Sequence, residues 1–213
     1  MKLIFNLFLF SQLCSFCYSQ TNVDITSKEN SYVFRFLPST KDNIYGIAFG
    51  IVGSETVCNF PNTKNSHGIN IQIIGQGLFI PLNRNAFGYK TNFMTDSSYM
   101  VKNINDVLFK AKHNGLLISG FGTMTDITNG ISISFLSSMG YYMNGISINL
   151  LSSKYTNVNG LSIAINNEAY KVNGIQIGLI NRTNKLKGFQ FGIWNVNSKR
   201  RLPFINWNFK ESS

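Results

Sequence analysis

Few residues in this sequence could carry out catalysis, and none has an obvious partner. His67 and His113 are the only histidines, and each lies within two residues of a glycine where related segments carry Asn, which predicts turn residues rather than a ligand or a general base. The acidic residues show no pair with the spacing of a glycosidase or a metal site. Cys58 lies in a Pro- and Asn-containing loop without a matched base. The sequence therefore predicts a non-enzymatic protein with no catalytic residue, no cofactor and no metal.

Basic residues are the second group with chemical potential. The formal net charge is +10, and the excess is concentrated late, in a span without an acidic residue that contains Lys171, Arg182, Lys185, Lys187, Lys199, Arg200 and Arg201. These seven cations are candidate contacts for a polyanion or for lipid headgroups, because such a patch attracts phosphates of lipid, polysaccharide or nucleic acid. Nucleic acid is disfavoured, because aromatic residues do not interleave with the basic ones. The competing interpretation is that these are solvated turns that keep the protein soluble.

The elements that must position these residues are six copies of one short unit, which fill residues 114–195. The glycines that mark the copies, called key glycines below, are Gly115, Gly130, Gly145, Gly160, Gly174 and Gly188. A fixed short period of this kind indicates a repeat architecture or an array of strands. Early copies follow Gly46 and Gly68, and further strands are expected at 31–37 and 203–209.

Apolar and polar residues alternate within each copy, which predicts β-strands and an all-β fold. One row, three residues after the key glycine, contains Ile133, Ile148, Ile163, Ile177 and Phe191. The opposite row contains Ser132, Ser147, Ser162, Gln176 and Gln190. Short polar links such as 182–185 between the strands suit hairpins.

The N-terminus predicts export. Residues 1–19 have the pattern of a cleaved signal peptide, with Lys2 before the apolar run 3–10. One all-β repeat domain then fills residues 20–213, and Cys58 is its only cysteine, so no internal disulfide is expected. We expect the protein at the outer membrane or cell surface, or alternatively secreted.

The best-formed copies, 174–181 and 188–195, and the closing segment 202–209 resemble the surface repeat-containing proteins of spirochaetes and Bacteroidota, which carry tandem Gly-Ile-Gln-Ile-Gly-Leu-Ile-Asn units. The resemblance covers residues 46–209. It implies a secreted or cell-surface protein with no known catalytic residues.

Two architectures fit the repeat. The favoured one is an antiparallel up-and-down barrel of outer-membrane type, because each strand has the length that a tilted membrane strand needs. In it the Ile row would face lipid and the Ser/Gln row the lumen. The alternative is a β-solenoid with one repeat per coil, in which identical residues would stack into Ile and Asn ladders and Ile163 would be buried between sheet layers. The weakness of the solenoid is that its return side offers little apolar surface for a core.

Three functions remain open at this stage. The chain could be a structural protein of the outer membrane, with lipid as its partner. It could be an adhesin or binding module that holds a glycan, lipid or host protein on its sheet face or on the loops at 53–66 and 94–104. It could also bind a polyanion through the basic C-terminal turns. The sequence does not determine the oligomeric state.

Overall fold

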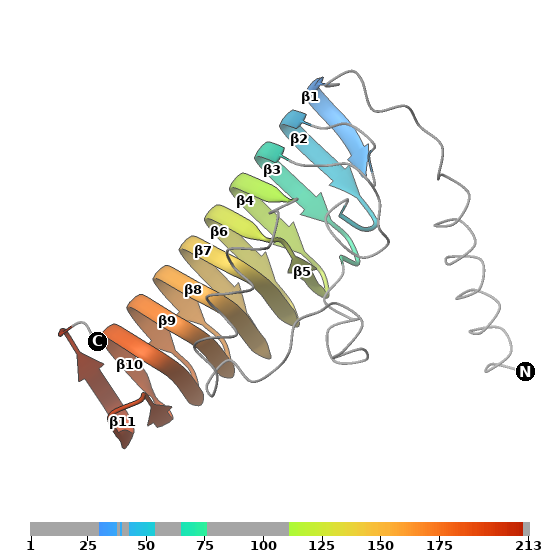
Figure 1. Ribbon diagram of the computed structural model, residues 1–213. Coiled ribbons are helices and arrows are strands. Elements are labelled where there is room, and N and C mark those ends of the chain that lie inside the picture. Colours follow the sequence, from blue (N-terminus) through green and yellow to red (C-terminus); the bar gives the residue numbers. More distant parts are fainter. Residues whose placement is uncertain (1–29, 38, 40–42, 54–64, 76–110, 211–213) are drawn as a thin grey trace, which may run out of the picture.

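The computed structural model describes residues 30–37, 39, 43–53, 65–75 and 111–210, and these form an elongated stack of coils (Figure 1). The strands are β1 Asn30–Leu37, β2 Asn43–Gly50, β3 Asn65–Gln72, β4 Lys112–Ser119, β5 Gly122–Met124, β6 Ile127–Ser134, β7 Ser137–Asn149, β8 Ser152–Ile163, β9 Asn166–Ile177, β10 Ile180–Val196 and β11 Arg201–Asn208. Ten of them form one sheet in chain order, with β5 paired to β7 beside it. The all-β prediction is confirmed.

The architecture is the β-solenoid, and the favoured antiparallel barrel is wrong. Each coil pairs with the next in parallel, from β1 through to β10, and β11 pairs with β10 in the antiparallel sense. Residues 182–185, which were predicted to form a hairpin link, lie inside β10 on the return side of a coil. The basic turn predicted at 196–201 does form a hairpin, between β10 and β11.

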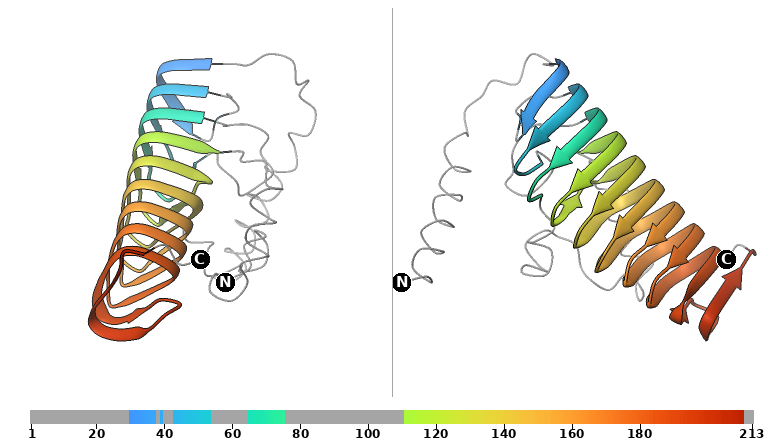
Figure 2. Two further views of the ribbon diagram at one scale, coloured as in Figure 1. Left: turned by 60° about the vertical axis from the view of Figure 1, so that its left-hand side comes forward. Right: turned by 180° about the vertical axis from the view of Figure 1, so that it is seen from behind.

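The key glycines, together with Gly46 and Gly68, pair with one another from coil to coil and so form a single row along the stack. Gly160 has a φ of +134°, a backbone conformation that only glycine adopts readily. A Cβ at this position would collide with the carbonyl oxygen of Gly145 in the preceding coil. The left view of Figure 2 shows the coils as stacked loops with corners.

The interior of the solenoid is largely polar. In the C-terminal coils, buried amides form ladders along the axis: Gln190 Nε2 donates to Gln176 Oε1 at 2.8 Å, and Asn206 Nδ2 donates to Gln190 Oε1 at 2.9 Å. The facing return side carries a second ladder, in which Asn167 Nδ2 donates to Asn181 Oδ1 at 2.8 Å and Asn181 Nδ2 donates to Asn195 Oδ1 at 2.7 Å. These hydrogen bonds satisfy most of the buried amide groups. The exception in these two ladders is Gln176 Nε2, which has no partner.

Apolar side chains fill the rest of the interior. A cluster of Met143, Tyr155, Val158, Val172 and Leu186, with Ala169, is buried in the middle and C-terminal coils. Burial raises the pKa of Tyr155, although hydroxyls of neighbouring serines oppose that effect. The core is therefore mixed, with apolar side chains on one part of the coil and hydrogen-bonded polar ladders on the rest.

The two predicted rows do lie on opposite faces, but their orientation is the reverse of that expected for a solenoid. The Ser/Gln row is at most 1% exposed, whereas Ile133, Ile148 and Ile177 are 38–40% exposed. The reason is the polar return side. Ser162 Oγ donates to Ser153 Oγ at 2.8 Å across the coil, and an Ile in that place would leave Ser153 without this partner.

The outward residues one and three positions after the key glycines, with their equivalents in β1 to β3 and β11, form a surface called the apolar face below. All ten strands of the sheet contribute two apolar side chains to it, namely Phe34, Phe36, Ile47, Phe49, Ile69, Ile71, Leu116, Ile118, Ile131, Ile133, Ile146, Ile148, Leu161, Ile163, Ile175, Ile177, Phe189, Phe191, Ile205 and Trp207. None of these twenty residues is charged, and at the β11 end the guanidinium of Arg200 lies over the Trp207 ring.

Some predictions concern residues outside the described ones: the signal peptide at 1–19, Cys58, the loop at 94–104 and most of the loop at 53–66. The last residues of the predicted loop at 53–66 belong to β3, which begins at Asn65. No helix in the part of the chain that the structure describes is long and apolar enough to cross a membrane.

Candidate functional site

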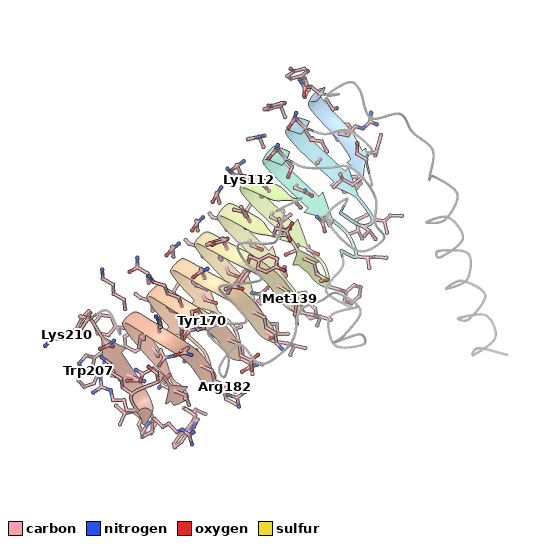
Figure 3. The ribbon with its side chains drawn as sticks, viewed as in Figure 1. Lys112, Met139, Tyr170, Arg182, Trp207 and Lys210 are labelled. Carbon is pink, nitrogen blue, oxygen red and sulfur yellow. The ribbon has the colours of Figure 1, made fainter. Side chains whose placement is uncertain are left out.

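The seven cations predicted as a patch fall into three separate places. Lys171 and Lys185 are paired residues of β9 and β10, and Lys187 lies two residues further along β10, all before the key glycines. Arg182 lies on the return side, and Figure 3 places it on the edge of the stack opposite Lys112, which precedes a key glycine in β4. The remaining three lie where the chain turns from β10 into β11: Lys199 and Arg200 are in the turn, and Arg201 is the first residue of β11.

The first group belongs to a longer surface, which we call the amide–lysine strip. It consists of the outward residues one and three positions before the key glycines on β4 and β6 to β10: Lys112, Asn114, Ile127, Asn129, Tyr142, Asn144, Asn157, Asn159, Lys171, Asn173, Lys185 and Lys187. Parallel pairing in a constant register stacks like residues, so asparagines dominate the row next to the glycines and lysines gather at its C-terminal end.

The asparagines next to the glycines form the Asn ladder that the solenoid alternative predicted. Asn129, Asn144 and Asn159 each donate from Nδ2 to the Oδ1 of the asparagine in the preceding coil, at 2.7 Å in every case. An amide has two N–H donors and two acceptor lone pairs. Within the ladder each inner amide therefore spends one donor and one acceptor on its neighbours, and the other donor and acceptor can bind a ligand at the surface.

Acidic groups are absent from the strip in the described coils because the two that these coils contain are engaged elsewhere. Asp126 is buried and accepts a hydrogen bond from the backbone N–H of Ala111 at 3.0 Å. Glu168 lies on the return side, between Lys154 at 3.5 Å and Arg182 at 3.1 Å. Arg182 is thus an ion-pair partner rather than part of the strip, and the charge of the strip is positive.

The hairpin cations include one that has a structural role. Arg200 lies over the ring of Trp207 at 4.7 Å, and its Nε donates to Asn206 Oδ1 at 2.9 Å. Its guanidinium also donates to the Trp207 backbone carbonyl. These contacts hold the antiparallel strand β11 against β10, where Asn206 ends the interior Gln ladder. Lys199 and Arg201 are exposed beside it.

Both histidines lie within strands, so their prediction as turn residues is wrong. His67 continues the row of the Asn ladder, where its Nδ1 lies 3.2 Å from Asn114 Nδ2 and its ring stacks on Tyr45 at 4.8 Å. His113 points inward, with Nδ1 2.6 Å from Ser66 Oγ, and burial lowers its pKa to about 4. A buried pair of this kind is closed to a substrate. The described coils contain no group of three metal-ligating side chains.

Sequence reasoning found Lys171, Lys185 and Lys187 but not Lys112, and it gave the asparagines no binding role. Their constant place before five of the six key glycines was the signal that could have identified them, because identical polar residues at constant phase stack only in a parallel array. Compared with protein-family models, with curated proteins and with solved structures, the chain gives no match.

Proposed function

We propose that this protein is a non-enzymatic, exported β-solenoid of the cell surface that binds acidic polysaccharide along the amide–lysine strip. The observation that carries this proposal is the combination of a hydrogen-bonded Asn ladder with neighbouring lysines on one outer surface. The pattern of residues 1–19 supports export, and the resemblance to surface repeat proteins supports the location.

The strip offers both kinds of contact that an acidic sugar polymer needs. Amides donate to and accept from sugar hydroxyls, and the ladder leaves each of its inner amides one of each for this purpose. Lysine ammonium groups form charge-assisted hydrogen bonds with carboxylates, sulfates or phosphates. Since the ladder is parallel to the solenoid axis, a linear polymer lying along it would meet an equivalent amide in each coil.

Preorganisation favours a long ligand over a small one. The backbone of each strand of the strip is fixed by strand pairing on both sides, and the ladder amides are joined to their neighbours at 2.7 Å. Binding therefore orders few protein side chains, which lowers its entropic cost. A small anion would contact only one or two lysines, whereas a polymer contacts many groups at once.

The test is binding of polygalacturonate to the mature chain by calorimetry over a range of salt concentrations, with neutral dextran as the control polymer. The triple variant Lys171→Gln, Lys185→Gln, Lys187→Gln should bind about 100-fold more weakly, taking about 1 kcal/mol for each surface cation. The matched control, Lys154→Gln, Lys199→Gln, Arg201→Gln, removes the same charge from the return side and from the hairpin, outside the strip. It should change the affinity by less than about 10-fold.

A further variant separates recognition of sugar from attraction of charge. Asn173 is exposed in the row next to the glycines, so Asn173→Leu should weaken binding without changing its salt dependence. Equal losses in the two triple variants would contradict the proposal, since they would mean that net charge alone acts. Binding of phosphatidylglycerol vesicles in place of polygalacturonate would assign the strip to lipid headgroups instead.

A further inference from the structure

The apolar face is large enough for a stable interface between proteins. Ten strands spaced about 4.8 Å apart give it a length of about 45 Å. Exposed apolar residues five positions after the key glycines, such as Leu150, Ile165 and Leu179, extend the face to a width of about 18 Å. Its area is therefore about 800 Å², which exceeds the largest apolar patch of most monomers and equals one side of a standard protein interface.

We propose that two copies of this chain associate through their apolar faces to form a two-sheet sandwich. The dimer has a two-fold axis in the plane of the interface and parallel to the strands, so that the solenoid axes run in opposite directions. This arrangement keeps the strands of the two sheets aligned, as in packed β-sheets that lie about 10 Å apart. It places β1 opposite the partner copy's β11, and the centre of the interface lies between β6 and β7.

The surface relief of the face is complementary to itself in this orientation. Over β8 to β10 it contains a shallow apolar groove of about 610 Å³, whose floor includes Ala164, Gly178 and Gly192. The opposite end of the face, on β1 and β2, carries protruding rings: Phe36 is 68% exposed and Phe49 is 37% exposed. The two-fold axis brings Phe49 of each copy, on β2, over the β10 end of the partner copy's groove, so the face is complementary to itself as an isologous interface requires.

The charge distribution selects the same orientation. The C-terminal end of each copy, from β9 to β11, contains most of the cations in the described coils, including Lys185 and Arg200. Solenoids that run in the same direction would place these two ends side by side. In the antiparallel dimer the cationic ends lie roughly 40 Å apart, well beyond the Debye length of about 8 Å at physiological salt.

Packing of sheet on sheet also suits the backbone of the face. Each strand from β2 to β10 is paired on both sides, so covering the face buries side chains without burying unpaired backbone groups. Ile, Leu and Phe are the residues found between packed sheets. The charged group that lies against the face is the Arg200 guanidinium, which already stacks on the Trp207 ring at the end of the interface. In the dimer the two amide–lysine strips stay outside the interface, because they lie before the key glycines rather than after them.

The test is the molar mass of the mature chain, by light scattering and by sedimentation equilibrium over a dilution series. We expect a dimer that dissociates on dilution. Ile148→Lys places a charge near the two-fold axis and should weaken association at least 100-fold. Asn144→Lys adds the same charge to the same strand, β7, on the amide–lysine strip, and should leave association unchanged. Because Ile148 is already 38% exposed, the variant should fold, and its unfolding midpoint in the monomeric state verifies this.

Disulfide trapping tests the orientation. On a Cys58→Ser background, Phe49→Cys combined with Phe191→Cys should give intermolecular disulfides under mild oxidation, since β2 lies opposite the partner copy's β10. Either substitution alone should give none. Cross-links formed by Phe49→Cys alone would mean that the solenoids run in the same direction, which would overturn the proposed dimer.

The remaining outcomes separate this inference from the polysaccharide proposal. A wild-type chain that is monomeric at every concentration would overturn the dimer, and so would association that Asn144→Lys abolishes and Ile148→Lys does not. Binding of phosphatidylcholine vesicles by a monomer, lost in Ile148→Lys, would assign the face to lipid. In each case polygalacturonate binding could persist. Conversely, a dimer that does not bind polygalacturonate would overturn the proposed function alone.

Discussion

The inward orientation of the polar row makes a specific prediction for Gln190, which is fully buried. Gln190 is the middle amide of the ladder that joins Gln176 to Asn206, at 2.8 and 2.9 Å. Gln190→Leu removes both contacts and leaves two buried polar groups without these partners, at roughly 1–3 kcal/mol each. About 1 kcal/mol is regained by burying more apolar surface. The expected loss in the free energy of unfolding is therefore about 1–5 kcal/mol, although a hydrophobic residue has been placed in the core.

The adjacent residue provides the matched control. Phe191 lies on the apolar face and is 36% exposed, so Phe191→Gln should cost about 1 kcal/mol or less in the monomer. The assay is urea unfolding at low protein concentration, followed by circular dichroism, with the loss taken from the midpoint at an unchanged slope. If Gln190→Leu is neutral or stabilising and Phe191→Gln costs several kcal/mol, the Ile/Phe row lies inside and the reasoning is wrong.

A double variant isolates the ladder from other effects of the substitution. Gln176 Oε1 accepts a hydrogen bond from Gln190, whereas Gln176 Nε2 has no partner. The bond to Gln190 is therefore the one that joins the Gln176 side chain to its ladder. Once Gln190 is Leu, replacing Gln176 as well removes an amide that is already unpaired. The double variant Gln176→Leu, Gln190→Leu should therefore cost clearly less than the sum of the two single variants. Additive losses would mean that the two side chains do not act through their hydrogen bond.

Two further predictions concern the backbone and pH. Gly160→Val should cost at least about 2 kcal/mol of unfolding free energy, because φ is +134° and the side chain would meet Gly145. Val33→Gly should stabilise the fold by up to about 1 kcal/mol, because Val33 occupies the same row in the first strand at a φ of +73°. A loss of stability in both variants, measured by urea unfolding, would contradict this. The pKa of His113 is lowered from 6.5 to about 4, so the unfolded chain binds more protons between these values. Stability should be complete above pH 6.5 and should fall by about 3 kcal/mol as the pH drops to 4. His113→Gln should remove this part of the slope of unfolding free energy against pH, and an unchanged slope would refute the assignment.

The polar interior explains how a narrow coil can be stable. A coil of 14 or 15 residues has too little room for large side chains from both sides, and its return side carries mainly Ser, Thr and Asn. Short polar side chains that repeat at constant phase can bond along the axis as well as across the coil. Ser162, for example, contacts both Ser153 at 2.8 Å and Asn167 at 2.7 Å. The ladders turn a row that would be costly to bury singly into a satisfied network.

The sequence by itself determined the elements of the site but not their grouping. The period, the strands and the two opposite rows could be read from residues alone, since alternation fixes which side chains share a face. The lysines of the strip were also visible. That Arg182 belongs to an ion pair with Glu168, and not to the strip, depends on which side of the coil each residue occupies. No local pattern contains that information.

Tertiary structure decided whether the strands run parallel or antiparallel, and which face lies inside. Period-two alternation is identical in a barrel and in a solenoid, and a link of a few polar residues can be either a hairpin or a return strand. The orientation of the rows depends on what lies across the coil. Ser162 is buried because the return side offers it Ser153 and Asn167 as partners, and Gln176 is buried because the next coil offers it Gln190. Ile133 is left outside because that interior has no place for it. Such pairing joins residues far from any single repeat, so only the folded stack determines it.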